Sequence, residues 1–61
     1  MLIKLKKDCK LECWSGLEDK FVKFKKGMEF EMDEEIEGYY VCNDDFYGVV
    51  YVDKKLGGEI I

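Results

Sequence analysis

The sequence predicts an all-β fold from three observations. Apolar and charged residues alternate with a period of two over residues 3–13, and the same alternation returns over 28–33. Two runs rich in β-branched and aromatic residues, 39–42 and 49–52, flank a polar loop that ends in Gly48. Such alternation places every second side chain on one face of a strand, so we expect strands that each bury one face.

The first expected element covers residues 3–13. Apolar side chains occupy its odd positions, except Lys7, and charged side chains occupy its even positions. The interruption at Lys7 and Asp8 predicts either one long strand or two strands joined by a bend. In both cases the odd positions face the core, and the even positions form a lysine-lined face in water.

The segment before Gly27 fits two structures. Ser15 and Glu18 have the spacing of a capping box, and three apolar residues of the segment recur at helical intervals, which indicates one short helix over 16–26. The run 21–24 is equally typical of a strand that enters a Lys-Lys-Gly turn. We favour the strand, because a helix this short needs tertiary contacts to form.

The second half is expected to form antiparallel strands within one domain, 1–61. A half-buried strand covers 28–33, and the two β-rich runs that follow should pair through the loop 43–48. Residues 53–55 suit a turn, after which 56–61 offers glycines and an apolar end for a last edge strand. The expected core consists of Ile3, Leu5, Leu11, Phe24, Met28, Phe30, Met32, Val41, Val50 and Val52.

The three cysteines, Cys9, Cys13 and Cys42, are expected to be buried and reduced. An odd number does not suit a small secreted domain stapled by disulfides. A closed zinc site needs four ligands, and Cys9 and Cys13 on one strand would lie about 13 Å apart at a rise of ~3.3 Å per residue. We therefore expect no metal and no cofactor.

The composition argues against an enzyme. The chain has no His, Arg, Thr, Gln, Pro or Ala, and only one Ser and one Asn. Without His there is no Ser-His or Cys-His pair to activate a nucleophile at neutral pH. The acidic residues match neither a calcium loop nor the enclosed carboxylate pair of a hydrolase. The expectation is a non-catalytic protein.

Charge is distributed unevenly along the chain. The formal net charge is -4, yet residues 1–27 hold eight Lys against four acidic residues, and residues 28–47 hold eight acidic residues and no base. We expect an acidic side of the surface if strand pairing keeps these segments apart. The sequence contains neither a run of roughly 20 apolar residues nor the apolar region of a signal peptide. The expected location is the cytoplasm, without a membrane partner.

The order of these features resembles a known group of small proteins. An aromatic residue, a Lys-Gly turn and an aromatic strand occur at 24–30, and a Tyr-rich strand that ends in an Asp turn occurs at 39–44, before Gly48 and another strand. This pattern is similar to that of the small SH3-like barrel proteins of phages and prophages, which are mostly uncharacterised. The resemblance implies a small SH3-like barrel of five to six antiparallel strands.

The expected function is that of a small binding module with a protein partner. Carboxylates interleaved with aromatic rings suit a basic protein surface, because charges steer association and rings anchor it. Such a surface imitates nucleic acid. Together with the resemblance, it implies a phage-encoded inhibitor of the anti-CRISPR type, which acts on a host protein that handles nucleic acid. The expected contact residues are Glu31, Asp33, Glu34, Glu35, Glu37, Tyr40, Asp44, Asp45, Phe46 and Tyr47.

Two alternatives of other classes stay open. One is a barrel that binds nucleic acid through lysines such as Lys4, Lys6, Lys10 and Lys26. The negative net charge and the lack of Arg argue against such direct binding. The other alternative is a structural or homo-oligomeric barrel whose exposed edge strand adds to a neighbour.

Overall fold

The computed structural model describes residues 1–55 and 58–60, with side chains over 1–55, and it confirms the all-β prediction. In these residues seven strands form one antiparallel sheet: β1 (Leu2–Leu5), β2 (Cys9–Trp14), β3 (Asp19–Phe24), β4 (Glu29–Ile36), β5 (Tyr39–Asp44), β6 (Gly48–Asp53) and β7 (Gly58–Ile60). Their order across the sheet is β3-β2-β6-β5-β4-β1-β7. The short β7 brings the number of strands above the expected five to six.

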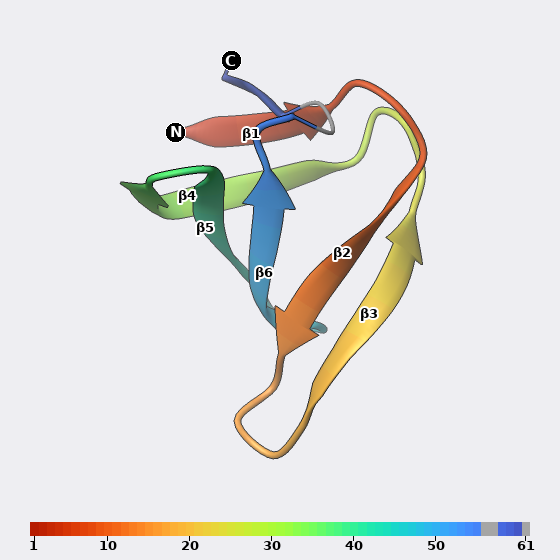
Figure 1. Cartoon of the computed structure of the whole chain (residues 1–61), viewed down its shortest axis with the longest axis vertical. Coiled ribbons are helices and arrows are strands. Elements are labelled where there is room, and N and C mark those ends of the chain that lie inside the picture. The colour runs from red at the N-terminus through yellow and green to blue at the C-terminus, as the bar shows by residue number, and fades with distance from the viewer. Residues whose placement is uncertain (56–57, 61) are drawn as a thin grey trace.

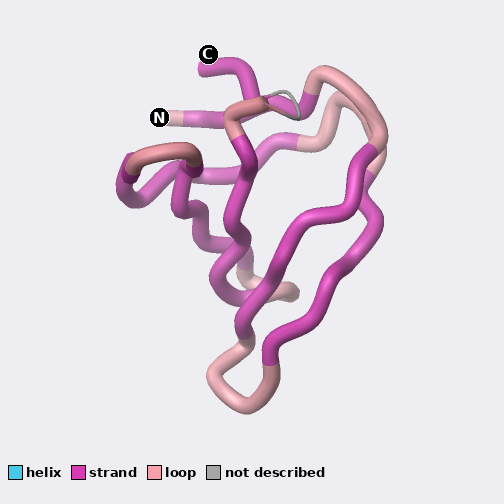
Figure 2. The backbone as a smooth tube through the Cα atoms, viewed as in Figure 1, coloured by secondary structure: helices cyan, strands magenta, loops and turns pink. Residues whose placement is uncertain are grey.

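The sheet is strongly curled (Figure 1). β2, β3 and β6 run along the long axis of the molecule, and β1 and β4 cross its upper end. The curled sheet wraps around the core as a half-barrel. The half-barrel is open because β3 and β7 stand at the two ends of the strand order and do not pair with each other in the described sheet. The described backbone consists of strands and loops (Figure 2), and nothing in it could serve as a membrane-spanning helix.

The alternating segment 3–13 forms two strands rather than one. β1 pairs with β4, whereas β2 pairs with β3 and β6, so the bend between them carries the chain from one part of the sheet to another. Asp8 fixes this bend, because its Oδ1 accepts a hydrogen bond from the backbone N–H of Lys26 at 2.7 Å. The bend is thereby tied to the turn between β3 and β4.

The alternative of a helix over 16–26 is wrong, and the strand interpretation is confirmed. All six residues of β3 pair with residues of β2. The backbone N–H of Ser15 donates to the carbonyl of Glu18 at 3.2 Å, so the two residues with capping-box spacing close a hairpin turn instead. Cross-strand pairing supplies tertiary contacts that an isolated short helix lacks.

The antiparallel arrangement of the second half is confirmed. β4 extends the expected strand at 28–33 to Ile36, and β5 and β6 pair over their full lengths. In the next turn the backbone N–H of Lys55 donates to Asp53 Oδ1 at 2.8 Å. β7 pairs with β1 as the expected edge strand, while residues 56, 57 and 61 of that prediction lie outside the described residues.

The core lies inside the curl and contains nine buried side chains from the described residues. Seven are those that the alternation predicts, namely Ile3, Leu5, Leu11, Phe24, Phe30, Val50 and Val52. Cys13 and Cys42 complete the core; Met28 and Met32 are half-buried and pack against it, whereas Val41 is half-buried and faces outward, contrary to expectation. Val41 faces outward because Cys42 points inward, and adjacent residues of a strand point to opposite faces.

Aromatic contacts hold the edge strand β3 to the rest of the core. The ring of Phe24 packs edge-to-face on Phe30, with ring centroids 5.1 Å apart, and on Tyr47, with centroids 4.9 Å apart. Each such pair contributes roughly 0.5–1.5 kcal/mol to stability, beyond what the burial of the two rings contributes. Phe24 therefore links β3 to β4 and to the turn between β5 and β6.

Candidate functional site

A β-bulge in β4 changes which of its side chains face the core and which face outward. The pairing of β4 with β5 shifts between Met32 and Glu34. Before the shift, Met32 lies opposite the buried Cys42; beyond it, Glu34 lies opposite the outward-facing Val41. The bulge inserts one residue, so simple alternation gives the wrong face for the residues after it.

The predicted contact residues do not form one surface. Glu35 and Glu37 lie at the turn between β4 and β5, and Asp45 and Phe46 lie at the turn between β5 and β6. These turns stand at opposite ends of β5, which is roughly 17 Å long at ~3.3 Å per residue. The remaining predicted residues are Glu31, Asp33, Glu34, Tyr40, Asp44 and Tyr47, which lie along β4 and β5 or in the second turn.

Two of these residues form a clamp around Lys54. Its Nζ lies 2.7 Å from Glu35 Oε2 and 5.1 Å from the ring centroid of Tyr40. Its backbone N–H donates to the carbonyl of Gly38 at 3.0 Å. Glu35 and Tyr40 therefore help to hold the turn after β6 against the hairpin of β4 and β5.

The turn between β5 and β6 also has internal contacts. Asp44 Oδ2 accepts hydrogen bonds from the backbone N–H groups of Phe46, at 2.8 Å, and Tyr47, at 2.9 Å. This is an Asx turn, which suits the Asp at its first position. Tyr47 packs on the core at Phe24, whereas Phe46 is 84% exposed. Asp44 and Tyr47 thus have structural roles, and Phe46 is left at the surface.

Another set of aromatic and acidic residues shares the outer face, by which we mean the side of the sheet that points away from the core. The strand register arranges these residues in rows that run from β3 to β4. One row consists of Phe21, Glu12, Tyr51, Val41 and Glu34. The adjacent row consists of Asp19, Trp14, Val49, Asn43 and Glu31. No lysine occurs in β4, β5 or β6.

The rings of the outer face are accessible. Trp14 is 47% exposed, Phe21 is 68% exposed and Tyr39 is 41% exposed, while Tyr51 is half-buried. The contact residues expected from the sequence include none of these four, because sequence reasoning assigns the aromatic contacts to Tyr40, Phe46 and Tyr47. A signal was present for Trp14: it follows Cys13, and a residue next to an inward-facing one must face outward.

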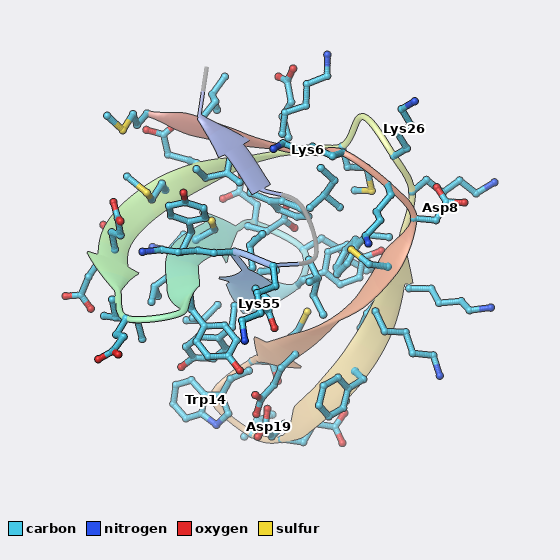
Figure 3. All side chains as sticks on the ribbon, turned by 45° about the horizontal axis from the view of Figure 1, so that its top comes forward. Lys6, Asp8, Trp14, Asp19, Lys26 and Lys55 are labelled. Atoms are coloured by element: carbon cyan, nitrogen blue, oxygen red, sulfur yellow. The ribbon has the colours of Figure 1, made fainter. Side chains whose placement is uncertain are left out.

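Two carboxyl groups approach each other on this face. Asp19 lies opposite Trp14, and Glu12 precedes Trp14 by two residues, which makes the two acids diagonal neighbours. A hydrogen bond with the Asp19 carboxyl, then the charge of Asp19, then burial raise the pKa of Glu12 above its ordinary value of 4.5. Figure 3 shows Trp14 and Asp19 together at the end of the β2–β3 hairpin.

Lysines gather at the other end of this hairpin. Lys10 lies directly opposite Lys23, and both line a hollow of about 420 Å³. Figure 3 places Lys6 and Lys26 at this end too, away from Trp14. Like charges directly opposite each other destabilise a strand pair. The fold keeps the charge asymmetry of the sequence, because this end of the hairpin is basic and β4, β5 and β6 contain no lysine.

The three thiols are free, with Cys9 half-buried and Cys13 and Cys42 buried. Burial raises the pKa of each thiol and is the largest cause in every case. The pKa of Cys42 rises to about 11, with the charge of Glu31 as the second cause. Over the part of the chain that the structure describes, no three His, Cys, Asp or Glu side chains are grouped as metal ligands would be.

Comparison with known proteins gives no match, whether with family models, curated proteins or solved structures. The resemblance to SH3-like barrels of phages stays a prediction.

Proposed function

We propose that this protein is a non-catalytic, SH3-like binding module that binds a basic surface of a partner protein through its outer face. The proposal depends on one observation, the interleaving of exposed rings with carboxylates across β3, β2, β6, β5 and β4. Buried aromatic side chains contribute much of the affinity of protein interfaces, and charges around them steer association. Glu31 and Glu34 of the predicted set belong to this face.

The charge of the outer face favours a protein over nucleic acid. It carries Glu12, Asp19, Glu31, Glu34 and Asp53 against Lys10 and Lys23 at the basic end of the β2–β3 hairpin, and the strands β4 to β6 contribute no lysine. A surface of this sign attracts cations and repels phosphates. It supports the more specific proposal that the partner is a cytoplasmic host protein whose basic surface otherwise binds nucleic acid, and that a phage-encoded module competes for that surface.

The free edge of β3 favours a second candidate, self-association. β3 stands at one end of the strand order, so one side of its backbone lacks a strand neighbour in the described sheet. An exposed edge can accept a strand from another copy. Lys20 and Lys23 are exposed on β3 and oppose this association, because they would bring like charges together. Sedimentation velocity separates the candidates, since only self-association gives a dimer mass without a partner.

The proposed function is tested with two variants of equal charge change. The outer-face variant carries Glu31→Lys and Glu34→Lys; the control variant carries Glu18→Lys and Asp45→Lys, which lie in exposed turns. Each protein is immobilised, incubated with host lysate and eluted with duplex DNA. We expect the wild type and the control to capture basic proteins that DNA releases, and the outer-face variant to lose them. Equal capture by both variants, or capture of nucleic acid alone, would contradict the proposal.

A further inference from the structure

We propose that the hollow between Trp14 and Tyr51 on the outer face binds an arginine side chain of the partner. This inference rests on the proposed function and names the chemical group that the outer face recognises. The hollow has a volume of about 330 Å³ and is lined by Glu12, Trp14, Asp19 and Tyr51. It thus combines two rings with two carboxyl groups, which is the chemistry that a large, flat cation requires.

Strand pairing fixes the positions of these four residues. Glu12 lies opposite Tyr51 of β6, and Trp14 lies opposite Asp19 of β3. β2 is an internal strand, with β3 on one side and β6 on the other. Sites on paired strands hold their geometry better than sites on loops, so the hollow is formed before a ligand arrives.

The two carboxyl groups lack a neutralising partner of their own. Within residues 1–55, the lysine ion pairs are Lys20 with Glu18 and Lys54 with Glu35, and neither includes Glu12 or Asp19. Adjacent like charges destabilise a strand pair. Departures from favourable local chemistry are expected at functional sites, and a bound cation would relieve this one. The raised pKa of Glu12 agrees with this crowding of negative charge.

A guanidinium fits the hollow better than an ammonium. Its planar group carries five N–H donors in a fork that matches the two oxygens of a carboxylate, and its face stacks on aromatic rings. In the hollow, the carboxyl groups of Glu12 and Asp19 can accept these hydrogen bonds. The rings of Trp14 and Tyr51 can stack on the guanidinium at the same time. Lysine offers a compact, strongly hydrated charge instead. The chain contains no Arg, so its own residues cannot supply this ligand.

The test is an NMR titration of the isolated, ¹⁵N-labelled protein at pH 7 and low salt. The probes are N-acetyl-arginine amide, the corresponding citrulline compound, which is neutral and similar in shape, and the corresponding lysine compound. We expect saturable, millimolar binding of the arginine probe that moves the indole N–H of Trp14 and the amides of Glu12, Asp19 and Tyr51. The citrulline probe should leave them in place, and the lysine probe should bind several-fold more weakly.

Two variants complete the test. Glu12→Gln should weaken the arginine probe at least about fivefold, because a charge-assisted hydrogen bond becomes a neutral one. Glu29→Gln makes the same chemical change at an exposed residue of β4 that does not line the hollow, and it should leave binding unchanged. Equal shifts with citrulline, shifts outside the hollow, or unaltered binding by Glu12→Gln would overturn the inference. Since this titration uses no partner protein, its failure and the failure of the capture experiment are independent results.

Discussion

At the scale of single residues, Gly48 is constrained more than the other turn glycines. Its φ is +82°, and a Cβ placed on it would lie 2.6 Å from the carbonyl oxygen of Trp14. Gly27 has a similar φ of +92° but nothing within 4 Å of such a Cβ. The left-handed conformation alone costs about 1–2 kcal/mol for a residue with a side chain. At Gly48 the close approach of two backbones adds to this strain.

We expect Gly48→Ala to destabilise the protein more than Gly27→Ala. Gly27→Ala should lower the free energy of unfolding by about 1–2 kcal/mol, because only the backbone conformation is unfavourable. Gly48→Ala should lower it further, since β6 and β2 must also move apart. Urea denaturation followed by circular dichroism measures both values. Equal losses would show that the contact with the backbone of Trp14 contributes nothing.

The pKa of Cys42 predicts a loss of stability in alkaline solution. Burial keeps this thiol protonated in the folded state, with a pKa of about 11 against an ordinary value of 9.0. The contribution of this thiol to the free energy of unfolding is present in full below pH 9.0 and is lost as the pH rises toward about 11. At about 1.4 kcal/mol per pKa unit, a shift of about two units makes this contribution on the order of 3 kcal/mol.

Cys42→Ala isolates this effect from other groups that titrate at high pH. The free energy of unfolding of the wild type should fall more steeply between pH 9.0 and 11 than that of the variant. Denaturation curves at several pH values, with a reducing agent present, give the two slopes. Parallel slopes would mean that Cys42 ionises in the folded protein as easily as in the unfolded chain.

Glu12→Gln should raise the thermal unfolding midpoint at pH 7. Because the pKa of Glu12 is raised in the folded state, its ionised form destabilises the fold at neutral pH, and this penalty disappears as the pH falls through the carboxyl range. The advantage of the variant should therefore shrink in acid. Scanning calorimetry at pH 7 and at pH 4 tests this expectation. A variant that melts below the wild type at pH 7 would contradict it.

At the scale of elements, β3 depends on its single inward-facing aromatic ring. Phe21 and Phe24 are three residues apart, so a strand must place them on opposite faces. Phe24 is buried against Phe30 and Tyr47, whereas Phe21 is 68% exposed. β3 is an edge strand with one neighbour, and the packing of Phe24 is its main attachment to the core.

Phe24→Ala should therefore unfold the protein or nearly so. Removing a buried Phe costs about 3–5 kcal/mol, and a chain of this size has roughly 3–9 kcal/mol of stability in total. Phe21→Ala is the matched control on the same strand and should change stability by less than about 1 kcal/mol. Circular dichroism melting curves compare the two variants. A Phe24→Ala protein as stable as Phe21→Ala would contradict the assignment of the core.

The strands could be predicted from the sequence where the alternation of apolar and polar residues and the turn-forming residues indicated the same boundaries. Residues 3–13, the hairpin of β5 and β6, and the turn at 53–55 follow from alternation and from turn-forming residues. Residues 16–26 could not be decided, because a helix and a hairpin fit the same spacing and only pairing with β2 separates them. The bulge in β4 could not be predicted either, since nothing local specifies the inserted residue.

At the scale of the whole molecule, the curl of the sheet gives the protein two differently charged regions. Lys6, Lys10, Lys23 and Lys26 lie at one end of the β2–β3 hairpin, and the rings and paired carboxyl groups lie at the other end and across β6, β5 and β4. The sequence predicted the acidic character, because residues 28–47 hold no base. It did not predict which rings accompany the acids, because that depends on the register of β2 against both β3 and β6.

In the proposed function a partner protein covers the outer face, and Trp14 is the only tryptophan and lies on that face, so its fluorescence reports whether the face is covered. Its emission and its quenching by acrylamide are measured for the free protein and for the complex with a captured partner that lacks tryptophan or has it replaced. We predict a blue shift and strong protection from acrylamide in the complex, because the ring is 47% exposed in the free protein. Unchanged emission and quenching at saturating partner would show that binding occurs elsewhere and would contradict the claim.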